Sequence, residues 1–297
     1  MRIDIIKNRK LYFTFSTLLV VLSLATLVFK GINYGLDFTG GNLIQVKFEK
    51  NIELKELNPI LDEISKEIPE VSGTSRKVQI SDESEVIIRT PEMGEAEKNN
   101  FMNLLSEKVG KYDLLRSDKV GASIGEELKT TAITALVVGI LLIVGYITIR
   151  FEFKFALAAV LALFHDVIIA VGGIALLGYE VNTPFIAAVL TILGYSINDT
   201  IVVFDRIREV LKKKKVDNLG DAINLSINQT LTRSINTSFT TFLAILAILL
   251  FGGASLQVFI TTLLIGVLIG TYSSIFLASP VIFLLDKDKK LEDIGHH

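Results

Sequence analysis

Asp199 is the residue of this sequence best placed to do chemistry. It lies in segment 194–200, between the apolar stretch 184–193 and the apolar run that starts at Ile201, and Asn198 adds an amide beside it. A charge at that depth costs roughly 3 kcal/mol on membrane-insertion scales, so such a residue usually faces other helices or water. A carboxyl group there can take up and release a proton. The alternative is a structural acid that only hydrogen-bonds a neighbouring helix.

Arg233 is the expected partner of Asp199. It lies near the start of the next apolar segment and shares a helical face with four polar residues, Asn236, Thr237, Thr240 and Thr241. Burial favours a neutral acid, whereas a nearby guanidinium favours a carboxylate. The proton occupancy of Asp199 is therefore expected to respond to a modest conformational change. The alternative is that Arg233 reaches the membrane interface and only fixes the topology.

His165 and Asp166 interrupt a third apolar segment near its middle. Aspartate there meets the same cost as Asp199, and histidine titrates near neutral pH. The pair predicts either a second station for protons or a hydrogen bond between helices. A metal site is not expected, because the only other histidines are His296 and His297 at the end of the chain.

The elements that must position these residues are membrane-spanning helices. Half of the residues are hydrophobic, the mean hydropathy is +0.52, and several apolar runs approach or exceed the roughly 20 residues that a span requires. The absence of cysteine excludes disulfides and thiolate metal sites. We predict six spans, at 11–30, 127–149, 155–178, 184–205, 230–251 and 256–285. The first is expected to remain as an anchor, although its basic leader would also suit a signal peptide.

Lysine and arginine are concentrated in alternate loops, which predicts the orientation of the chain. The basic positions expected on one side are Arg2, Lys7, Arg9, Lys10, Arg150, Lys154, Arg206, Arg208, Lys212 to Lys215, Lys287, Lys289 and Lys290. Both termini, including the tail 286–297, are therefore expected in the cytoplasm. The basic run after the fourth span is expected to attract anionic membrane lipid, with a protein-docking site as the alternative.

Segment 31–126 is predicted to form an extracytoplasmic α+β domain between residues 1–30 and the five-helix bundle 127–285. Alternating apolar residues predict strands at 43–48, 77–80, 86–89 and 112–115, and helical periodicity predicts helices near 54–68 and 101–109. The order βαββαβ is that of a ferredoxin-like fold. Ser123 and Glu126 have the spacing of a capping box before the next span, with an ordinary loop as the alternative.

The remaining motifs argue against an enzyme. Segment 35–41 is glycine-rich, but it lacks the pattern of a phosphate-binding loop and chemically predicts a turn into the first strand. The H-E-x-x-H and G-x-S-x-G signatures of hydrolases are absent. The basic run has no interleaved aromatic residues, so no nucleic-acid partner is expected. We expect neither an enzyme activity nor a cofactor.

Two motifs resemble the SecD/SecF family of protein-export membrane proteins. One motif is segment 194–209, which is similar to the SecF form of the fourth span and of the residues that follow it. The short length and the single outside domain also resemble the SecF branch more than the larger SecD branch. The other motif is the GLDFTGG signature, which is formed by Gly35, Leu36, Asp37, Phe38, Thr39, Gly40 and Gly41.

The resemblance implies a subunit of the Sec protein translocase, related in architecture to the RND transporters, in the bacterial cytoplasmic membrane. In this family SecF pairs with SecD beside the SecYEG channel, and proton flow supports export of the preprotein. The resemblance makes Asp199 the essential acid and Arg233 the essential basic residue. Asp166 and Asn198 are supporting candidates for the proton pathway.

Two other classes of function stay open at this point. A substrate-carrying pump of the RND type would need a larger outside region with a pocket. A scaffold that only stabilises the translocase would use the buried charges to hold helices together. Proton uptake measured across substitutions of Asp199 distinguishes a motor from a scaffold.

Overall fold

The computed structural model of the chain describes residues 3–82, 84–213, 216, 218–253 and 256–286. It divides into two compact units, one formed by Met1–Asn33 with Thr134–His297 and the other by Tyr34–Ile133. The predicted tail 286–297, apart from Asp286, lies outside the described residues. The same is true of several basic positions and the terminal histidines, namely Arg2, Lys214, Lys215, Lys287, Lys289, Lys290, His296 and His297.

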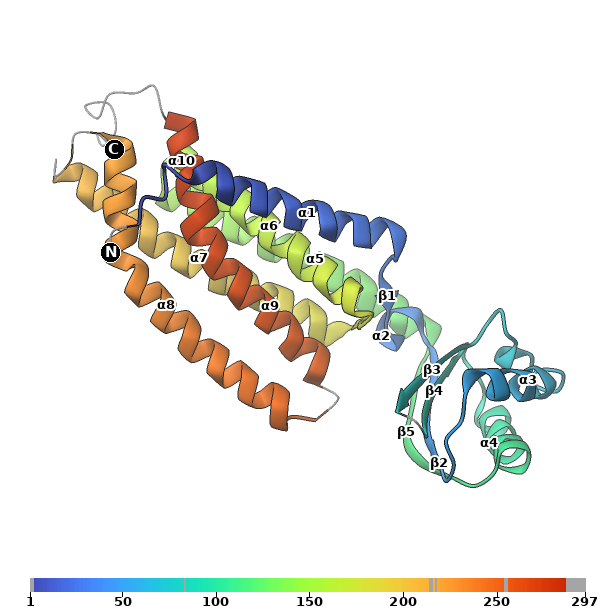
Figure 1. Cartoon of the computed structure of the whole chain (residues 1–297). Helices are drawn as coiled ribbons and strands as arrows, with labels where there is room; N and C mark the ends of the chain where they lie inside the picture. The colour runs from blue at the N-terminus through green and yellow to red at the C-terminus, as the bar shows by residue number, and fades with distance from the viewer. Residues whose placement is uncertain (1–2, 83, 214–215, 217, 254–255, 287–297) are drawn as a thin grey trace. The chain divides into compact units, whose positions relative to one another are not determined.

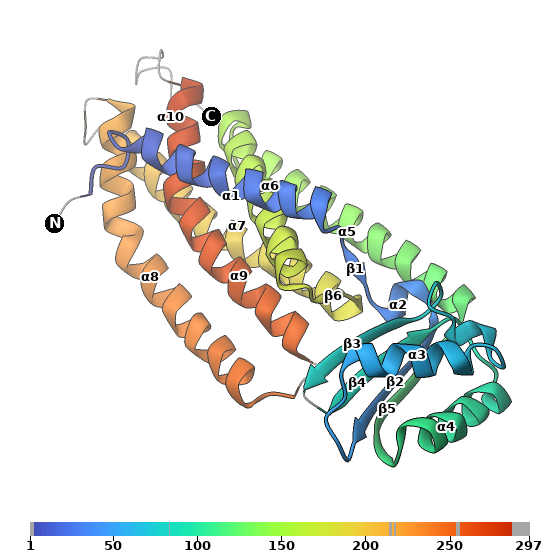
Figure 2. The same ribbon diagram turned by 45° about the vertical axis from the view of Figure 1, so that its right-hand side comes forward.

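Six helices in the described ranges are long and apolar enough to cross a membrane, which confirms the predicted number of spans. Figures 1 and 2 show them lying side by side. α6, α7 and α9 bury more of their residues within this chain than the other three do. The six are α1 (Arg9–Phe29), α5 (Ala122–Arg150), α6 (Phe153–Leu177), α7 (Thr183–Lys212), α8 (Leu219–Phe251) and a continuous helix made of α9 (Gln257–Ser273), η3 (Ser274–Ala278) and α10 (Ser279–Asp286).

α8 begins at Leu219 and therefore extends well beyond the predicted span 230–251 at its amino-terminal end. Asn218 caps the helix, because its side chain accepts a hydrogen bond from the N–H of Asp221 at 2.8 Å. The added turns bury an apolar face that includes Ile223. Arg233 consequently lies in the interior of a long helix and not near its start.

The start of α5 also differs from the prediction. Ser123 is the second residue of α5, so the capping box predicted from Ser123 and Glu126 was wrong. The first helical N–H, that of Ala122, instead donates to the carboxylate of Glu92 at 3.3 Å. Glu92, which is distant in sequence, therefore caps the helix in place of a neighbouring residue.

The unit 34–133 has the predicted βαββαβ order. Its four main strands form one sheet in the order β3-β4-β2-β5, in which every neighbouring pair is antiparallel, as a ferredoxin-like fold requires. β5 is longer than predicted, because it continues to pair with β2 past a bulge. The elements are α2 (Leu36–Thr39), β2 (Gly41–Phe48), α3 (Leu54–Ile64), η1 (Pro69–Val71), β3 (Lys77–Asp82), β4 (Glu85–Thr90), α4 (Glu95–Val109) and β5 (Tyr112–Val120), and two-residue strands occur at β1 (Asn33–Tyr34) and β6 (Glu180–Val181).

One face of this sheet carries the core of the unit. Ile44, Val46 and Phe48 alternate along β2 and are buried against the helices. Leu61 of α3 and Phe101 of α4 are fully buried in the same cluster. Both helices lie on this face of the sheet (Figure 2). Burial of each such side chain contributes about 1.5–3 kcal/mol.

Small residues bring the membrane helices close together. A Cβ atom added to Gly266 of α9 would lie 2.2 Å from Cγ1 of Ile192 on α7. A Cβ atom on Gly172 of α6 would lie 2.4 Å from that of Ser23 on α1. Helices in membranes associate through such close contacts, because lipid provides no hydrophobic force between them.

The basic segments of the bundle gather at one end. Arg150, the last residue of α5, lies 3.2 Å from Asp205 of α7. The guanidinium of Arg9 at the start of α1 lies 5.2 Å from the centroid of the Phe283 ring in α10. The first and last helices therefore meet at one end, as an even number of spans requires.

Candidate proton-transfer site

Asp199 is on the buried face of α7 and is 5% exposed. The helix starts where the side chain of Asn182 accepts a hydrogen bond from the N–H of Phe185 at 3.1 Å. Oδ2 of Asp199 is buried and has no hydrogen-bond partner among the described residues. Buried carboxyl oxygens are normally bonded, so this one is free to bind a proton, a water or a group from another subunit.

The polar groups that act on the Asp199 carboxyl come from α8, and they are Arg233, Ser234 and Ser238. Ser234 is 1% exposed, and its hydroxyl likewise has no hydrogen-bond partner within the described part of the chain. No ion pair within 4 Å joins Arg233 to Asp199, both of which the structure describes, so the guanidinium lies beyond salt-bridge distance of the carboxyl. The structure thus brings the predicted acid and basic residue to one interface without direct contact.

The polar face of α8 points largely away from the other helices of this chain. Arg233, Asn236, Thr237 and Thr240 are all exposed. Asn198 of α7 is exposed too, so it does not join Asp199 in the interior. The hydroxyl of Thr240 donates a hydrogen bond within its own helix, to the Asn236 carbonyl at 3.0 Å. A polar stripe in a membrane span favours contact with protein or water over contact with lipid.

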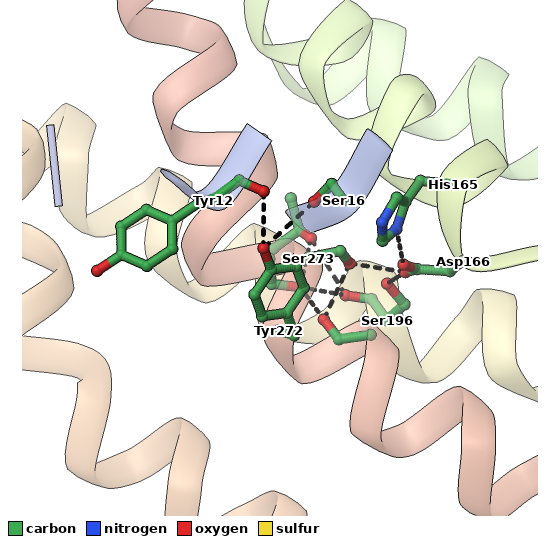
Figure 3. Close-up of polar contacts among 10 residues, drawn as sticks. Tyr12, Ser16, His165, Asp166, Ser196, Tyr272 and Ser273 are labelled. Carbon is green, nitrogen blue, oxygen red and sulfur yellow. Dashed lines mark hydrogen bonds and ion pairs between the residues drawn. The ribbon is translucent and has the colours of Figure 1, made fainter. Parts of the chain in front are cut away.

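Asp166 is the centre of a separate buried network (Figure 3). It is 0% exposed. Its Oδ2 accepts hydrogen bonds from Ser196 of α7 at 2.6 Å and from Ser273 of α9 at 2.8 Å. Its Oδ1 lies 2.9 Å from Nδ1 of His165. The hydrogen bond between helices that the sequence left as one alternative is therefore present.

The network continues into η3, which is a turn of π-helix. The hydroxyl of Ser274 lies 2.8 Å from that of Thr200 on α7 and 3.2 Å from the Ser196 carbonyl. Single π turns inside α-helices occur often at functional sites. Hydroxyls from α7 and η3 thus surround the same turn of α7 that carries Asp199.

Tyr272 links this network to α1. Its hydroxyl donates to the Tyr12 carbonyl at 2.9 Å and accepts from Ser16 at 3.3 Å (Figure 3). Its ring lies 6.4 Å from that of His165, with the planes nearly parallel. Nε2 of His165 is buried and has no hydrogen-bond partner among the described residues.

The sequence reasoning missed Thr200, Tyr272, Ser273 and Ser274. A signal was available, because Tyr272, Ser273 and Ser274 are consecutive polar residues inside an apolar segment. What the sequence could not give was their partner. Asp166 is 107 residues away from Ser273 along the chain.

The glycine-rich segment 35–41 forms α2 followed by two glycines with positive φ, 65° at Gly40 and 110° at Gly41. A Cβ atom on Gly41 would lie 2.2 Å from the Thr90 carbonyl oxygen. The chain turns here from α2 directly into β2. Within this unit, Gly40 and Gly41 therefore have a conformational role, which is to allow the turn from α2 into β2. The part of the chain that the structure describes contains no group of three His, Asp or Glu side chains suited to hold a metal ion.

Comparison with known protein families places this chain. The model of the family described as protein export membrane protein SecD/SecF, C-terminal, matches residues 101–288, and that of the SecD/SecF GG motif matches residues 26–52. The chain belongs to the SecD/SecF family. The GG-motif match contains Gly40 and Gly41, and the C-terminal match contains Asp166, Asp199 and Arg233.

Named relatives of this SecD/SecF chain are translocase subunits. It is 48% identical over 293 residues to the protein translocase subunit SecF of Sebaldella termitidis, and the match covers 98% of this chain and 94% of the relative. It is 40% identical over 285 residues to the protein translocase subunit SecDF of Thermus thermophilus, covering 95% of this chain but 38% of the relative.

A solved structure shows the same fold. The crystal structure of SecDF from Thermus thermophilus, described as a translocon-associated membrane protein, matches with a TM-score of 0.87 at 37% identity. The match covers 97% of this chain and 39% of that one. This SecD/SecF chain is therefore similar to only part of the longer SecDF chain of Thermus thermophilus.

Proposed function

We propose that this chain is the SecF subunit of a Sec translocase and acts with SecD to couple proton flow to protein export across the cytoplasmic membrane. The observation that carries the proposal is the Asp199 carboxyl, which is buried in a membrane span with an unbonded oxygen. The family of this chain and the names of its relatives support the translocase role. The proton step is our inference from the site.

Protonation of Asp199 is the proposed chemical event. The charged form is attracted by Arg233 and can accept strong hydrogen bonds from Ser234 and Ser238, whereas the neutral form loses the attraction to Arg233 and accepts only weaker bonds. The two forms therefore prefer different packings of α7 against α8. A ligand that binds two conformations unequally shifts the equilibrium between them, and here that ligand is the proton. Asn198, exposed one residue earlier on α7, extends the proposed path towards a partner.

The exposed polar stripe on α8 is the proposed SecD-facing surface. A stripe that holds Arg233 and Asn236 is expensive to leave in lipid, and a second membrane subunit would cover it. The SecDF relative supports the choice of SecD, because this chain matches only part of that longer protein. By family resemblance, the further partners are the SecYEG channel and the exported preprotein.

The orientation follows from the basic end of the bundle. Arg150 and Arg9 lie at the end where the first and last helices meet, and such clusters remain in the cytoplasm. Both termini are then cytoplasmic, and the α+β unit 34–133 is extracytoplasmic. The basic end would also contact anionic lipid.

Export by vesicles that contain the complete translocase tests the proton step. Asp199→Asn should abolish the part of export that depends on a proton gradient and leave the part that needs only ATP, and Arg233→Met should do the same. Asp205→Asn is the matched control, because Asp205 is half-exposed at the end of the same helix. Normal gradient-dependent export by Asp199→Asn would remove the proposal.

A scaffold is the second candidate, and the Asp166 network favours it. That network joins α6, α7 and α9 through hydrogen bonds that need no change of protonation. A scaffold predicts that Asp199→Asn lowers the amount of assembled complex while each remaining complex keeps its gradient-dependent export. Export normalised to assembled complex distinguishes the two candidates.

A further inference from the structure

We propose that Asp166 is a positioning residue that fixes the turn of α7 bearing Asp199. The inference rests on the proposed function, because Asp199 is the group that is positioned. Asp166 itself would then not carry protons through the membrane.

Asp166 holds α7 at Ser196. The Ser196 hydroxyl donates to Oδ2 of Asp166 at 2.6 Å, and Ser273 of α9 donates to the same oxygen at 2.8 Å. One carboxyl oxygen thus fixes α7 against α9. A Cβ atom on Gly270 of α9 would lie only 2.9 Å from that of Ser196, so the two helices have no space to slide past each other here.

The other side of the same turn is held by η3. Thr200 Oγ1 and Ser274 Oγ lie 2.8 Å apart, and each lies 3.2 Å from the carbonyl oxygen of Ser196. Asp199 stands between Ser196 and Thr200 in sequence. Both ends of its turn are therefore bonded to other elements, which sets the direction in which its carboxyl meets α8.

The two buried acids differ in how completely they are bonded. Asp166 has a partner on each oxygen and is 0% exposed, so a proton could reach it only after several hydrogen bonds broke. Asp199 has an oxygen with no partner among the described residues. A carrier must exchange its proton in each cycle, and only the incompletely bonded acid suits that requirement.

The groups that face His165 and Asp166 from other helices are hydroxyls and the Tyr272 ring. α7 brings Ser196, and α9 brings Ser273 and Tyr272. Tyr272 in turn bonds to the Tyr12 carbonyl and the Ser16 hydroxyl of α1. None of these groups is charged at neutral pH, so hydrogen bonds and not ion pairs join Asp166 to the neighbouring helices.

Infrared titration of the Asp199 carboxyl in the SecD-containing complex tests the inference, with Asp199→Asn as the spectrum to subtract. Asp166→Asn keeps acceptors for both hydroxyls and a donor towards Nδ1, so the Asp199 midpoint should shift by at most about half a pH unit, with export retained. Asp166→Ala leaves Ser196 and Ser273 unbonded. It should shift the midpoint by about one unit and lower gradient-dependent export about tenfold.

Two further variants keep the test decisive. Ser273→Ala removes one of the two hydroxyls and should shift the Asp199 midpoint in the same direction as Asp166→Ala, by a smaller amount. Ser226→Ala is the control, because the Ser226 hydroxyl is buried and, among the described residues, bonds only to the Ala222 carbonyl of its own helix, at 2.7 Å. It should leave the midpoint unchanged.

Loss of gradient-dependent export in Asp166→Asn as complete as that in Asp199→Asn would make Asp166 a carrier and overturn the inference. An unchanged Asp199 midpoint in both Asp166→Ala and Ser273→Ala would overturn it as well. The proposed function fails by a different result, which is normal gradient-dependent export by Asp199→Asn. In that case the infrared midpoints still decide whether Asp166 positions the turn.

Discussion

The hydroxyl of Ser196 on α7 lies 2.6 Å from Oδ2 of Asp166 on α6. Asp199 stands one turn further along α7, with a buried oxygen that has no hydrogen-bond partner among the described residues. The bundle therefore surrounds one acid completely and leaves the other incompletely bonded. On this contrast rests our proposal that Asp166 is structural and that Asp199 changes its protonation, although both lie at similar cost in apolar segments.

Replacing Gly266 by alanine should destabilise the bundle. The new Cβ would lie 2.2 Å from Cγ1 of Ile192, so α9 must move away from α7. Overpacking of this kind costs about 1–3 kcal/mol. Thermal unfolding of the purified chain in detergent measures the loss. Gly145→Ala is the control, because no described residue outside its own turn of helix lies within 4 Å of its Cβ position, and equal stability of the two variants would contradict the close α7–α9 contact.

Replacing Gly41 by alanine should destabilise the α+β unit more than the same change at Gly110. Both residues have positive φ, 110° and 123°, so both variants carry a conformational cost of about 1–2 kcal/mol. Only at Gly41 would the Cβ meet backbone, at 2.2 Å from the Thr90 oxygen. Hydrogen exchange of the amides of β2 and β4 in the full chain measures the difference. Equal losses would show that space plays no part in the glycine requirement.

The spans and the βαββαβ order could be predicted because each depends on local patterns. A spanning helix needs about 20 apolar residues, and a half-buried strand such as Ile44–Val46–Phe48 alternates with polar residues. The boundaries depend on single capping contacts. Glu92 satisfies the first N–H of α5 from a distant position, and no spacing rule within segment 123–126 contains that information.

The site could be predicted only in part, for a physical reason. Asp199 and Asp166 are visible in the sequence, because a carboxyl in an apolar run is unusual. Which neighbour each acid meets depends on helix rotation, and one residue rotates the side chain by about 100°. Arg233 is exposed on α8, whereas Ser234 beside it is buried, so the sequence alone could not rank them as partners.

The pKa of Glu63 should rise when Lys108 is replaced by methionine. The Lys108 ammonium lies 3.0 Å from the Glu63 carboxylate, and its hydrogen bond, followed by its charge, lowers the pKa of Glu63 from the ordinary 4.5. Because the folded pKa is the lower one, this stabilisation is present above about pH 4.5 and is lost as the pH falls through the folded pKa.

Carbon-detected NMR titration of Glu63 checks the direction. Lys108→Met should return the pKa towards 4.5, and high salt should do so partly, because exposed charges are screened. Lys66→Met is the control with the smaller effect, since the charge of Lys66 is the weakest influence on Glu63. A Glu63 titration that is the same in the wild type and in Lys108→Met would contradict the pairing.

Two asparagines of α8 should protect the backbone of residues 3–6 from hydrogen exchange. Asn228 accepts from the Ile3 N–H and donates to the Ile3 carbonyl, both at 2.9 Å. Asn224 accepts from the N–H groups of Ile5 and Ile6 at 2.9 and 3.1 Å. Replacing both asparagines by alanine should speed amide exchange of this segment about tenfold, as measured by mass spectrometry.

Asn236→Ala is the matched control for this pair of substitutions. Asn236 is on the same helix, but it is exposed and makes no side-chain hydrogen bond to the amino-terminal segment among the described residues. It should leave the exchange of residues 3–6 unchanged. Equal protection in the wild type and in the double variant would show that the asparagines do not hold the segment.

The polar stripe on α8 should be needed for assembly with SecD. Thr237 is exposed within this stripe, and its neighbours Arg233 and Asn236 are exposed as well. A tryptophan at 237 would block close approach of a second helix, and loss of a well-packed interface contact of this kind costs about 2 kcal/mol or more. Recovery of SecD with the affinity-tagged chain should therefore fall at least several-fold.

Leu142→Trp is the control for the stripe. Leu142 is 69% exposed on α5, in an entirely apolar setting that suits lipid. A tryptophan there adds the same bulk without disturbing a polar surface, so SecD recovery should match that of the wild type. The reverse pattern, in which Leu142→Trp loses SecD recovery and Thr237→Trp retains it, would assign the SecD contact to α5. The stripe on α8 would then face water or another subunit, because Arg233 and Asn236 still could not remain in lipid without cost.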